Sequence, residues 1–253
     1  MFHEIFYRPL LNALVFLYET IAFSDLGIAI ILLTIIIRLI LYPLFYKSYK
    51  SQALIQKIQP EIKRIQKESR ENRGAQAEQL MKLYKDHDIS PLSTFFPILS
   101  IIIQLPILIA LYKVFLDGLS PEVFGDLYSF VSSPDVLNLT LFGLINLVNP
   151  NILIVGLAAV FQYIQGKVSL ASLKNNSNTP EALAAQRMGK TMIFIGPIFT
   201  VVFFYSLPAA IGLYWVTTSI FSVLQQLYIN KTVVDTTHKK NHGKPSDENP
   251  TTS

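Results

Sequence analysis

Long runs without a charged residue constrain the fold of this chain more than any other feature. Uncharged runs of twelve and eight residues flank Arg38, and longer runs contain twenty-four (89–112), thirty-one (136–166) and forty residues (191–230). A helix needs about 20 residues to cross roughly 30 Å of hydrocarbon. The two runs around Arg38 together fit one span. The runs 89–112 and 136–166 each fit one span, and the run of forty residues fits two.

These runs predict an all-α polytopic membrane protein. Pro208 divides the last run, because proline is tolerated at the start of a helix, where its missing N–H would lack an intrahelical partner anyway. Only 15% of the residues are charged, compared with about 25% in soluble domains. We expect five transmembrane helices, near residues 27–46, 93–113, 150–170, 190–206 and 208–229.

The distribution of basic residues predicts the orientation of these spans. Residues 47–92 carry ten Lys and Arg, residues 167–190 carry four and the tail after Asn230 carries four, out of twenty-one in the chain. Short loops rich in Lys and Arg stay in the cytoplasm. We therefore expect the N-terminus outside and the C-terminus inside. Anionic lipid headgroups and RNA are candidate partners of the basic cytoplasmic face, without sequence-specific recognition of nucleic acid.

Three regions follow from this topology. Residues 1–24 contain an apolar stretch that could be a signal peptide, but Glu4 and Asn12 interrupt the required pattern. An amphipathic helix in the outer interface is the preferred interpretation. Residues 25–230 form the five-span core, with an external loop at 114–149 and a cytoplasmic loop at 171–189. Residues 231–253 form a flexible, basic cytoplasmic tail.

The cytoplasmic segment 47–92 is expected to form a helical hairpin. Apolar residues recur at helical spacing over 60–73 and 75–87, with a turn at Asn72-Arg73-Gly74 between them. The hairpin is either a topological spacer or a docking surface for a ribosome or targeting factor. The candidate docking residues are Lys63, Arg64, Lys67, Arg70 and Arg73.

Several classes of chemistry lack the residues that they need. The chain has no cysteine, and its four histidines all lie outside the expected spans. Asp86-His87-Asp88 is interpreted as a solvated turn beside Ser90-Pro91, because adjacent residues point in different directions. No Gly-rich nucleotide motif is present. We expect no catalytic residue, metal site or cofactor, and hence no enzyme.

Arg38 is the outstanding residue of the spans. A guanidinium within the membrane costs about 2.5 to 3.5 kcal/mol on insertion scales, so such residues usually face the interior of a bundle or water. Snorkelling to the headgroups is the alternative, but Lys47 is about 12 Å further along the helix. No carboxylate lies in any expected span to neutralise Arg38. We therefore expect water to reach it.

Other polar residues within the spans suggest where that water lies. Each could stabilise helix packing by hydrogen bonding, but together they predict a hydrated cavity around Arg38. The candidate residues are Thr34, Gln104, Gln162, Gln165, Tyr214 and Trp215.

The order of these features resembles a known family. It comprises Thr34-Ile-Ile-Ile-Arg38, Ile58-Gln-Pro-Glu-Ile62 at the start of the hairpin, Gln104-Leu-Pro-Ile-Leu108, and Leu207-Pro-Ala-Ala-Ile-Gly-Leu-Tyr-Trp215 followed by Leu224-Gln-Gln226. In this order the motifs are similar to those of the YidC-type membrane protein insertases, whose relatives include the mitochondrial oxidase-assembly and chloroplast albino insertases. The resemblance covers residues 1 to about 230.

The resemblance implies an insertase in the cytoplasmic membrane of a bacterium. Its partners would be nascent membrane proteins, the lipid bilayer, a ribosome or targeting factor and, in one alternative, a Sec-type translocon. The groove of the family would be marked here by Arg38, Thr34 and Trp215. The alternatives are a small secondary transporter or channel subunit for an anionic solute, and a scaffold that acts only through the hairpin.

Overall fold

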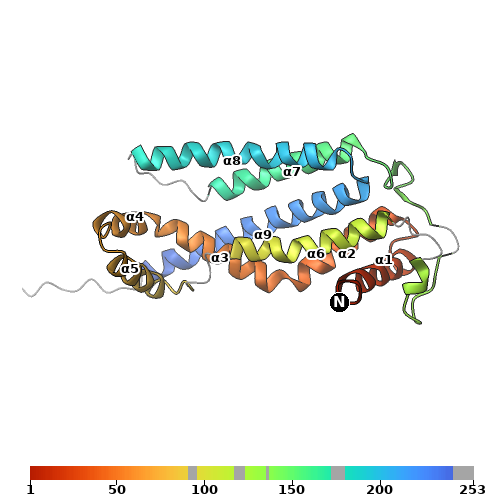
Figure 1. Cartoon of the computed structure of the whole chain (residues 1–253), viewed down its shortest axis with the longest axis horizontal. Helices are drawn as coiled ribbons and strands as arrows, with labels where there is room; N and C mark the ends of the chain where they lie inside the picture. Colours follow the sequence, from red (N-terminus) through yellow and green to blue (C-terminus); the bar gives the residue numbers. More distant parts are fainter. Residues whose placement is uncertain (91–95, 117–122, 135–136, 172–179, 242–253) are drawn as a thin grey trace, which may run out of the picture.

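Helices running along one direction form an elongated bundle (Figure 1). The computed structural model describes residues 1–90, 96–116, 123–134, 137–171 and 180–241. The bundle consists of α2 (Leu26–Ile40), α3 (Tyr42–Lys57), α6 (Phe96–Leu116), α7 (Ile152–Ala171), α8 (Pro180–Phe204) and α9 (Ala209–Asn241). The helix α9 is central, because it packs against α2, α3, α6 and α7, whereas α8 packs against α7.

The first expected span is broken. Instead of one helix over 27–46, α2 ends at Ile40 and α3 begins at Tyr42, and the two helices are bent by 64°. Pro43 lies in the first turn of α3. In a continuous helix its ring would clash with the carbonyl of Leu39, and it has no N–H to donate. The expectation of a continuous first span is therefore wrong.

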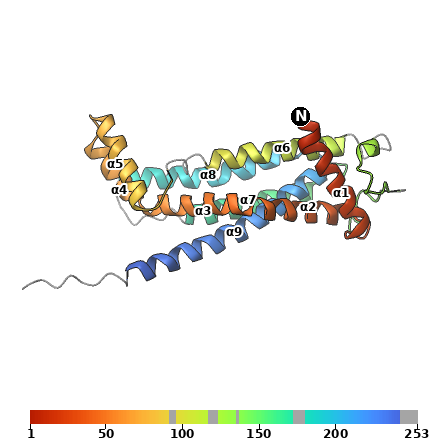
Figure 2. The same cartoon turned by 90° about the horizontal axis from the view of Figure 1, so that it is seen from below.

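The N-terminal segment lies across one end of the bundle (Figure 2). It forms a short π-helix, η1 (His3–Tyr7), which continues into α1 (Arg8–Thr20). Leu11, Leu14 and Tyr18 of α1 are buried. Asn12 is buried too, because its side chain donates to the Asp126 carbonyl at 3.0 Å and accepts from the Tyr128 amide at 2.6 Å. The polar side of α1 therefore faces protein at this position.

The segment between α6 and α7 contains a small β-hairpin that was not expected. It follows a 3-10 turn, η3 (Val123–Asp126), and pairs β1 (Thr140–Leu141) with β2 (Ile145–Asn146). Its loop contains Phe142 and Gly143 at positive φ. The fold is therefore helical with a minor β element at the end of the bundle that carries α1.

The helical hairpin projects from the opposite end (Figure 1). It is formed by α4 (Gln59–Glu68), which ends earlier than expected, and α5 (Arg73–Asp86), which begins earlier, so that Arg73 and Gly74 belong to α5 rather than to the turn. Asn72 caps α5 by accepting a hydrogen bond from the Ala75 amide at 3.1 Å. Ile62, Ile65 and Leu83 form a small core between the two helices, and Leu54 and Ile55 at the end of α3 pack against it.

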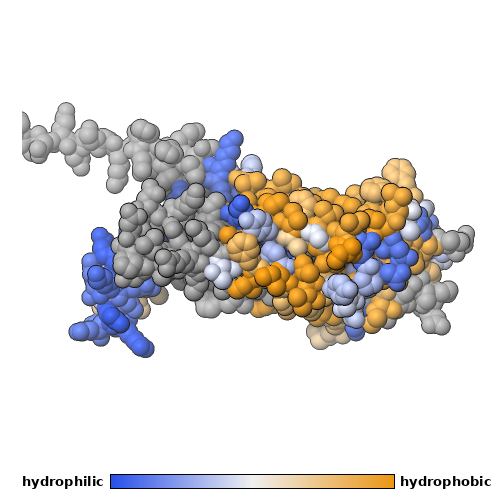
Figure 3. All heavy atoms as spheres, turned by 90° about the horizontal axis from the view of Figure 1, so that it is seen from above, coloured by the Kyte–Doolittle hydropathy of each residue, from blue (hydrophilic) through white to orange (hydrophobic). Residues whose placement is uncertain are grey.

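Apolar side chains cover the middle of the molecule, and the hairpin end is hydrophilic (Figure 3). By length and composition, one described helix can cross a membrane, with its apolar window at Ile152–Ser169, or two if the bent pair α2 and α3 is one span. The apolar stretches Ile102–Leu116 and Ile193–Phe204 are shorter. In α9, polar residues such as Thr217, Ser222 and Gln226, which are buried, interrupt the apolar sequence of the helix. Fewer apolar spans are therefore found than the expected five.

The expected and observed ends of the last two helices also differ. The helix α8 begins at Pro180, within the expected cytoplasmic loop 171–189, and α9 continues to Asn241, within the expected flexible tail. The rest of that tail, residues 242–253, lies outside the described residues.

Candidate functional site

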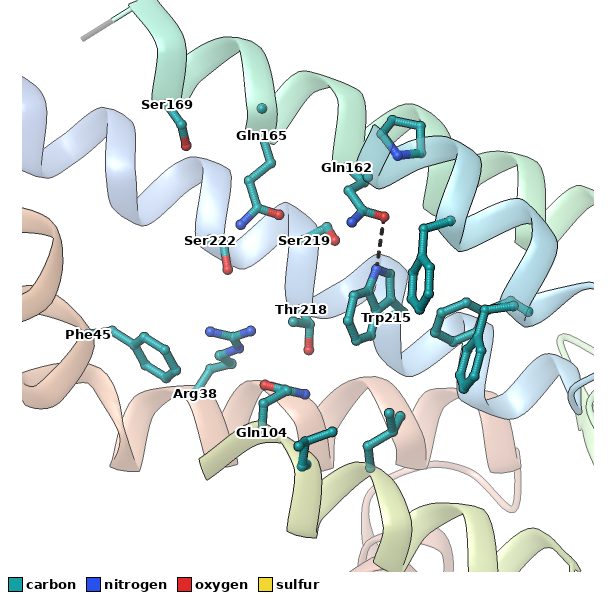
Figure 4. Close-up of a pocket in the computed structure, with 18 of the residues that line it drawn as sticks. Arg38, Phe45, Gln104, Gln162, Gln165, Ser169, Trp215, Thr218, Ser219 and Ser222 are labelled. Carbon is teal, nitrogen blue, oxygen red and sulfur yellow. Dashed lines mark hydrogen bonds between the residues drawn. The ribbon is translucent and has the colours of Figure 1, made fainter. Parts of the chain in front are cut away.

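A groove of about 530 Å³ lies between the helices of the bundle. Its lining comes from α2, α3, α6, α7, α8 and α9. Figure 4 shows Arg38, Gln104, Gln165 and Thr218 pointing into the same space from four different helices. Among the described residues that line the groove, Arg38 is the only charged one.

Arg38 is held in the groove without a counter-charge. Its side chain is 6% exposed, and within the described ranges no acidic side chain forms an ion pair with it. The ring of Phe45 on α3 lies beside the guanidinium, 4.6 Å from Cζ to the ring centroid. A desolvated cation–π contact of this kind is worth about 2 kcal/mol. The arrangement leaves the guanidinium N–H groups available for an anionic ligand or water.

Gln104 brings a polar amide to the groove from α6. Its Nε2 donates a hydrogen bond to the Tyr214 hydroxyl on α9. Pro106 lies two residues later inside the same helix and cannot donate a backbone hydrogen bond. The hydrogen bond between Gln104 and Tyr214 ties α6 to α9 beside Arg38.

Gln162 links three helices at the far side of the groove. Its side-chain oxygen accepts hydrogen bonds from Thr200 on α8 and from the indole nitrogen of Trp215 on α9, the latter at 3.4 Å (Figure 4). A Cβ on Gly196 would lie 3.1 Å from Nε2 of Gln162. Glycine at position 196 therefore gives the amide its space, and the shared acceptor fixes Trp215 at the groove wall.

One face of α9 supplies small hydroxyl groups. Thr218, Ser219 and Ser222 follow Trp215 at spacings of three, four and seven residues, which places them on one side of a helix. All three are buried and line the groove. Ser169 on α7 also lines it and donates to the Gln226 side chain at 3.0 Å.

The groove is closed toward the end of the bundle that carries α1. Phe204, Trp215 and Leu108 line the groove and also belong to, or pack against, the main apolar core. That core continues through α1, α2, α6 and α9 with residues such as Leu111 and Ile211.

The groove is not covered between α6 and α8. Leu105 and Leu108 of α6 and Phe199 and Phe203 of α8 line it from opposite sides. In the described part of the chain, α6 and α8 are not among the helix pairs that pack together. Leu105, Phe199 and Phe203 are also exposed on the outer surface. A side opening lined by apolar groups therefore connects the groove with the apolar outer surface.

The structure brings together five of the seven expected groove residues. Thr34 and Tyr214 do not line the groove. The Thr34 hydroxyl donates to the carbonyl of Ile30 in its own helix at 2.6 Å, and the Tyr214 ring is buried in the main core. Both residues lie nearer the closed end, where apolar packing surrounds them, and this differs from the sequence-based expectation.

The sequence interpretation missed much of the groove wall. Phe45 and Tyr49 on α3 and Phe199 and Phe203 on α8 line it. The three phenylalanines lie in apolar runs, where an aromatic residue carries no signal that distinguishes a groove from lipid or core, and Tyr49 lies between Lys47 and Lys50 in the segment expected to be cytoplasmic. The serine and threonine face of α9 did carry a signal, because Thr218, Ser219 and Ser222 follow Trp215 at helical spacings.

The candidate docking residues lie on the hairpin, away from the groove. Arg64, Lys67, Arg70 and Arg73 are exposed, and Lys63 is half-buried. The Nε of Arg64 lies 4.0 Å from the carboxylate of Glu68 in the same helix. An ion pair at such an exposed site stabilises the protein only weakly. Within the described residues, no group of three or more His, Cys, Asp and Glu side chains is placed to hold a metal ion.

Comparison with known proteins gives consistent matches over most of the chain. The family described as 60Kd inner membrane protein matches residues 16–237. A membrane protein insertase YidC of Pelobacter propionicus is 33% identical over 230 residues, which are 90% of this chain and 39% of the relative. One of Rickettsia bellii is 31% identical over 232 residues, 88% of this chain and 38% of the relative. One of Francisella tularensis subsp. novicida is 34% identical over 218 residues, which are 85% of this chain and 34% of the relative. The chain thus spans less than two fifths of the length of these relatives.

Proposed function

Because the chain belongs to the 60Kd inner membrane protein family, we propose that it is a membrane protein insertase. It receives nascent membrane proteins in the groove and releases them sideways into the bilayer. The observation that carries the proposal is one buried, unneutralised cation, Arg38, in a groove that is closed at one end and open at its side. The family description also confirms the expected location in the cytoplasmic membrane of a bacterium.

The groove lowers the cost of moving a polar segment into the membrane. Amide and hydroxyl groups of Gln104, Gln165 and Ser222 line it together with Arg38, so a polar segment exchanges water for protein partners. An acidic side chain gains more, since two unit charges 4 Å apart attract by about 4 kcal/mol at a protein surface and about 1 kcal/mol in water. The apolar segment of the substrate leaves between α6 and α8, where its burial in lipid drives the step. No covalent bond is formed or broken.

The closed end favours this function over the alternatives. A transporter or channel for an anionic solute needs a second exit, and Phe204 and Leu108 lie where the groove would have to continue. A scaffold that acts only through the hairpin has no use for a buried arginine, whose placement costs about 2.5 to 3.5 kcal/mol.

The direct test is reconstitution of the purified chain into liposomes. A short single-span substrate with an acidic translocated segment is synthesised in their presence, and protease protection measures its insertion. We expect insertion above that of empty liposomes, and less with Arg38→Ala. Equal insertion with empty liposomes would contradict the insertase function.

The five-span topology belongs to the same proposal. The hairpin and the C-terminal end of α9 lie at one end of the bundle, and α1 and the β-hairpin lie at the other (Figures 1 and 2). The absence of native cysteine allows single cysteines to be labelled without background. Labels at positions 70 and 240 are expected from the cytoplasmic side, and a label at position 128 from the outside. Labelling of positions 70 and 128 from one side would contradict this topology.

We further assign the hairpin a docking role toward a ribosome or targeting factor. Its core is small and is distinct from the main core, with Leu54 and Ile55 of α3 packed against it, and its exposed basic residues would attract RNA or an acidic protein surface. Reversing the charges of Lys67, Arg70 and Arg73 to Glu should reduce insertion in cells while the unfolding temperature of purified protein stays unchanged. Loss of stability in proportion to activity would make the hairpin a structural element instead. A Sec-type translocon is a candidate partner without a specific surface in the described residues.

A further inference from the structure

Phe45 occupies a position in the groove that the proposed insertion mechanism has not used. It lies on α3, beyond the break at Leu41, and its side chain is 5% exposed. Its ring lies beside the Arg38 guanidinium, 4.6 Å from Cζ to the ring centroid (Figure 4). Arg38 and Phe45 are seven residues apart in the sequence, and the bend of 64° between α2 and α3 lies between them.

The ring of Phe45 is itself held in place. The Tyr49 ring stacks on it one turn later, with 6.4 Å between ring centroids. The helix α3 packs against α9, and Gln225 of α9 donates from Nε2 to the carbonyl of Tyr42, 3.5 Å away, at the start of α3. Phe45 therefore has a fixed partner on its own helix, and its helix is fixed to the groove wall.

An aromatic ring stabilises a cation differently from a carboxylate. It attracts the cation through the negative potential of its face and leaves the positive charge unneutralised. The five N–H donors of a guanidinium lie in its plane, so contact with a ring does not consume them. A long side chain without such a partner would sample several rotamers and lose entropy on binding.

We infer that Phe45 is a positioning residue for substrates with acidic translocated segments: its ring holds the Arg38 guanidinium in the groove without competing for the substrate carboxylate. This inference rests on the proposed insertase function. It assigns a specificity role to α3, a helix on which no groove residue was expected. Neutral substrates should depend on Phe45 much less, because they do not use the charge of Arg38.

The test changes the electronic character of the ring while almost preserving its shape. Phenylalanine with one, two or three ring fluorines is incorporated at position 45, and insertion of matched acidic and neutral substrates into liposomes is measured. Fluorine withdraws electron density from the ring face, so insertion of the acidic substrate should fall stepwise, by roughly threefold to tenfold at three fluorines. Insertion of the neutral substrate should not change.

Phe115 provides a matched control. It is also 5% exposed, it lies on α6 in the main core, and in the described part of the chain no cation lies over its ring. The same fluorinated residues at position 115 should leave both substrates unaffected. A flat series at position 45, or an equal decline for the neutral substrate or at position 115, would overturn the inference.

A second measurement is independent of insertion. Arg38→Met should raise the unfolding temperature more in a Phe45→Leu background than in the native background, because leucine leaves the buried cation without its partner. Equal shifts of the unfolding temperature in both backgrounds would contradict a stabilising contact between Arg38 and Phe45. If the native chain inserts neither substrate, the proposed function fails, whereas native insertion with a flat fluorine series overturns only the role of Phe45.

Discussion

The carboxylate of Asp25 accepts a hydrogen bond from the backbone amide of Phe142, 2.6 Å away and 117 residues later in the chain. Its other oxygen accepts from the Ile28 amide at 3.0 Å and caps the start of α2. Phe142 has a φ of 52°, which is uncommon for a residue other than glycine. One buried side chain therefore fixes both the first helix of the groove wall and the loop of the β-hairpin.

Replacing Asp25 should destabilise this end of the bundle. Asp25→Ala leaves the Ile28 and Phe142 amides without their acceptor, and we expect a loss of about 2 to 3 kcal/mol in unfolding free energy. Asp25→Asn keeps one acceptor oxygen and should lose less than half as much unfolding free energy as Asp25→Ala. Thermal unfolding in detergent micelles measures both variants. Equal losses for the two would indicate that the charge, rather than the acceptor geometry, provides the stabilisation.

Gly27 of α2 packs against the β-hairpin. A Cβ at this position would lie 2.4 Å from Cδ1 and 3.0 Å from Cα of Leu141, so the backbone of the hairpin would have to move. We expect Gly27→Ala to destabilise the protein by about 1 to 3 kcal/mol.

Gly156 supplies the control for this substitution. It lies within α7, and no atom would come within 4 Å of its Cβ. Gly156→Ala should therefore be neutral or stabilise the helix by up to about 1 kcal/mol. The two variants differ only in their surroundings, so unfolding temperatures that shift in the same direction would contradict the packing argument.

His3 makes the docking of the N-terminal segment dependent on pH. Hydrogen bonds to the carboxylates of Glu4 and Asp126, at 3.1 and 3.0 Å, raise the pKa of His3 above 6.5. A raised pKa in the folded state means that the contact stabilises fully below about pH 6.5 and that the stabilisation is lost as pH rises through the raised value. The hydrogen bond from His3 likewise lowers the pKa of Glu4, so its contribution is lost as pH falls below the usual carboxyl range.

His3→Gln isolates this effect. The difference in unfolding temperature between the native chain and the variant should be largest near pH 5 to 6 and should decrease as pH rises through the raised pKa of His3. The effect should be small, because the groups are exposed and solvent screens them. A difference that grows toward alkaline pH would contradict the sign of the pKa shift.

Polar residues in apolar runs were the part of the site that could be predicted from sequence. Arg38, Gln104 and Gln162 are costly in a membrane unless they face one another or water, and all three line the groove. Thr34, which the same reasoning included, does not line this groove. A threonine can satisfy its hydroxyl on the carbonyl four residues earlier in its own helix, as Thr34 does with Ile30, and so needs no groove.

The arrangement around Leu41 was harder to predict. Pro43 is a visible signal for a helix break, but the direction of the bend depends on packing between α3 and α9, which are far apart in sequence. That bend brings Phe45 to Arg38. The β-hairpin was missed for a similar reason, since its strands have only two residues each and its loop depends on the distant Asp25.

Arg38 provides the most direct prediction about mechanism: its charge, more than its planar hydrogen-bonding geometry, serves the insertion of acidic segments. Lysine keeps a positive charge that can still contact the Phe45 ring, but it loses the bidentate geometry. Arg38→Lys should therefore retain most of the insertion of an acidic substrate. Arg38→Ala should reduce it by roughly tenfold or more, since an attraction of several kcal/mol in a partly dehydrated groove is lost.

A neutral substrate separates the charge from the groove itself. Matched substrates that differ only in acidic or amide side chains of the translocated segment are tested in a strain depleted of its own insertase, with the amount of each variant measured. Insertion of the neutral substrate should be nearly unchanged by Arg38→Ala, because the polar lining of the groove is sufficient for it. Removing an unneutralised buried charge should also leave the protein folded and raise its unfolding temperature. Equal loss for both substrates would contradict the electrostatic mechanism, and full activity of Arg38→Ala on both would exclude Arg38 from the functional site.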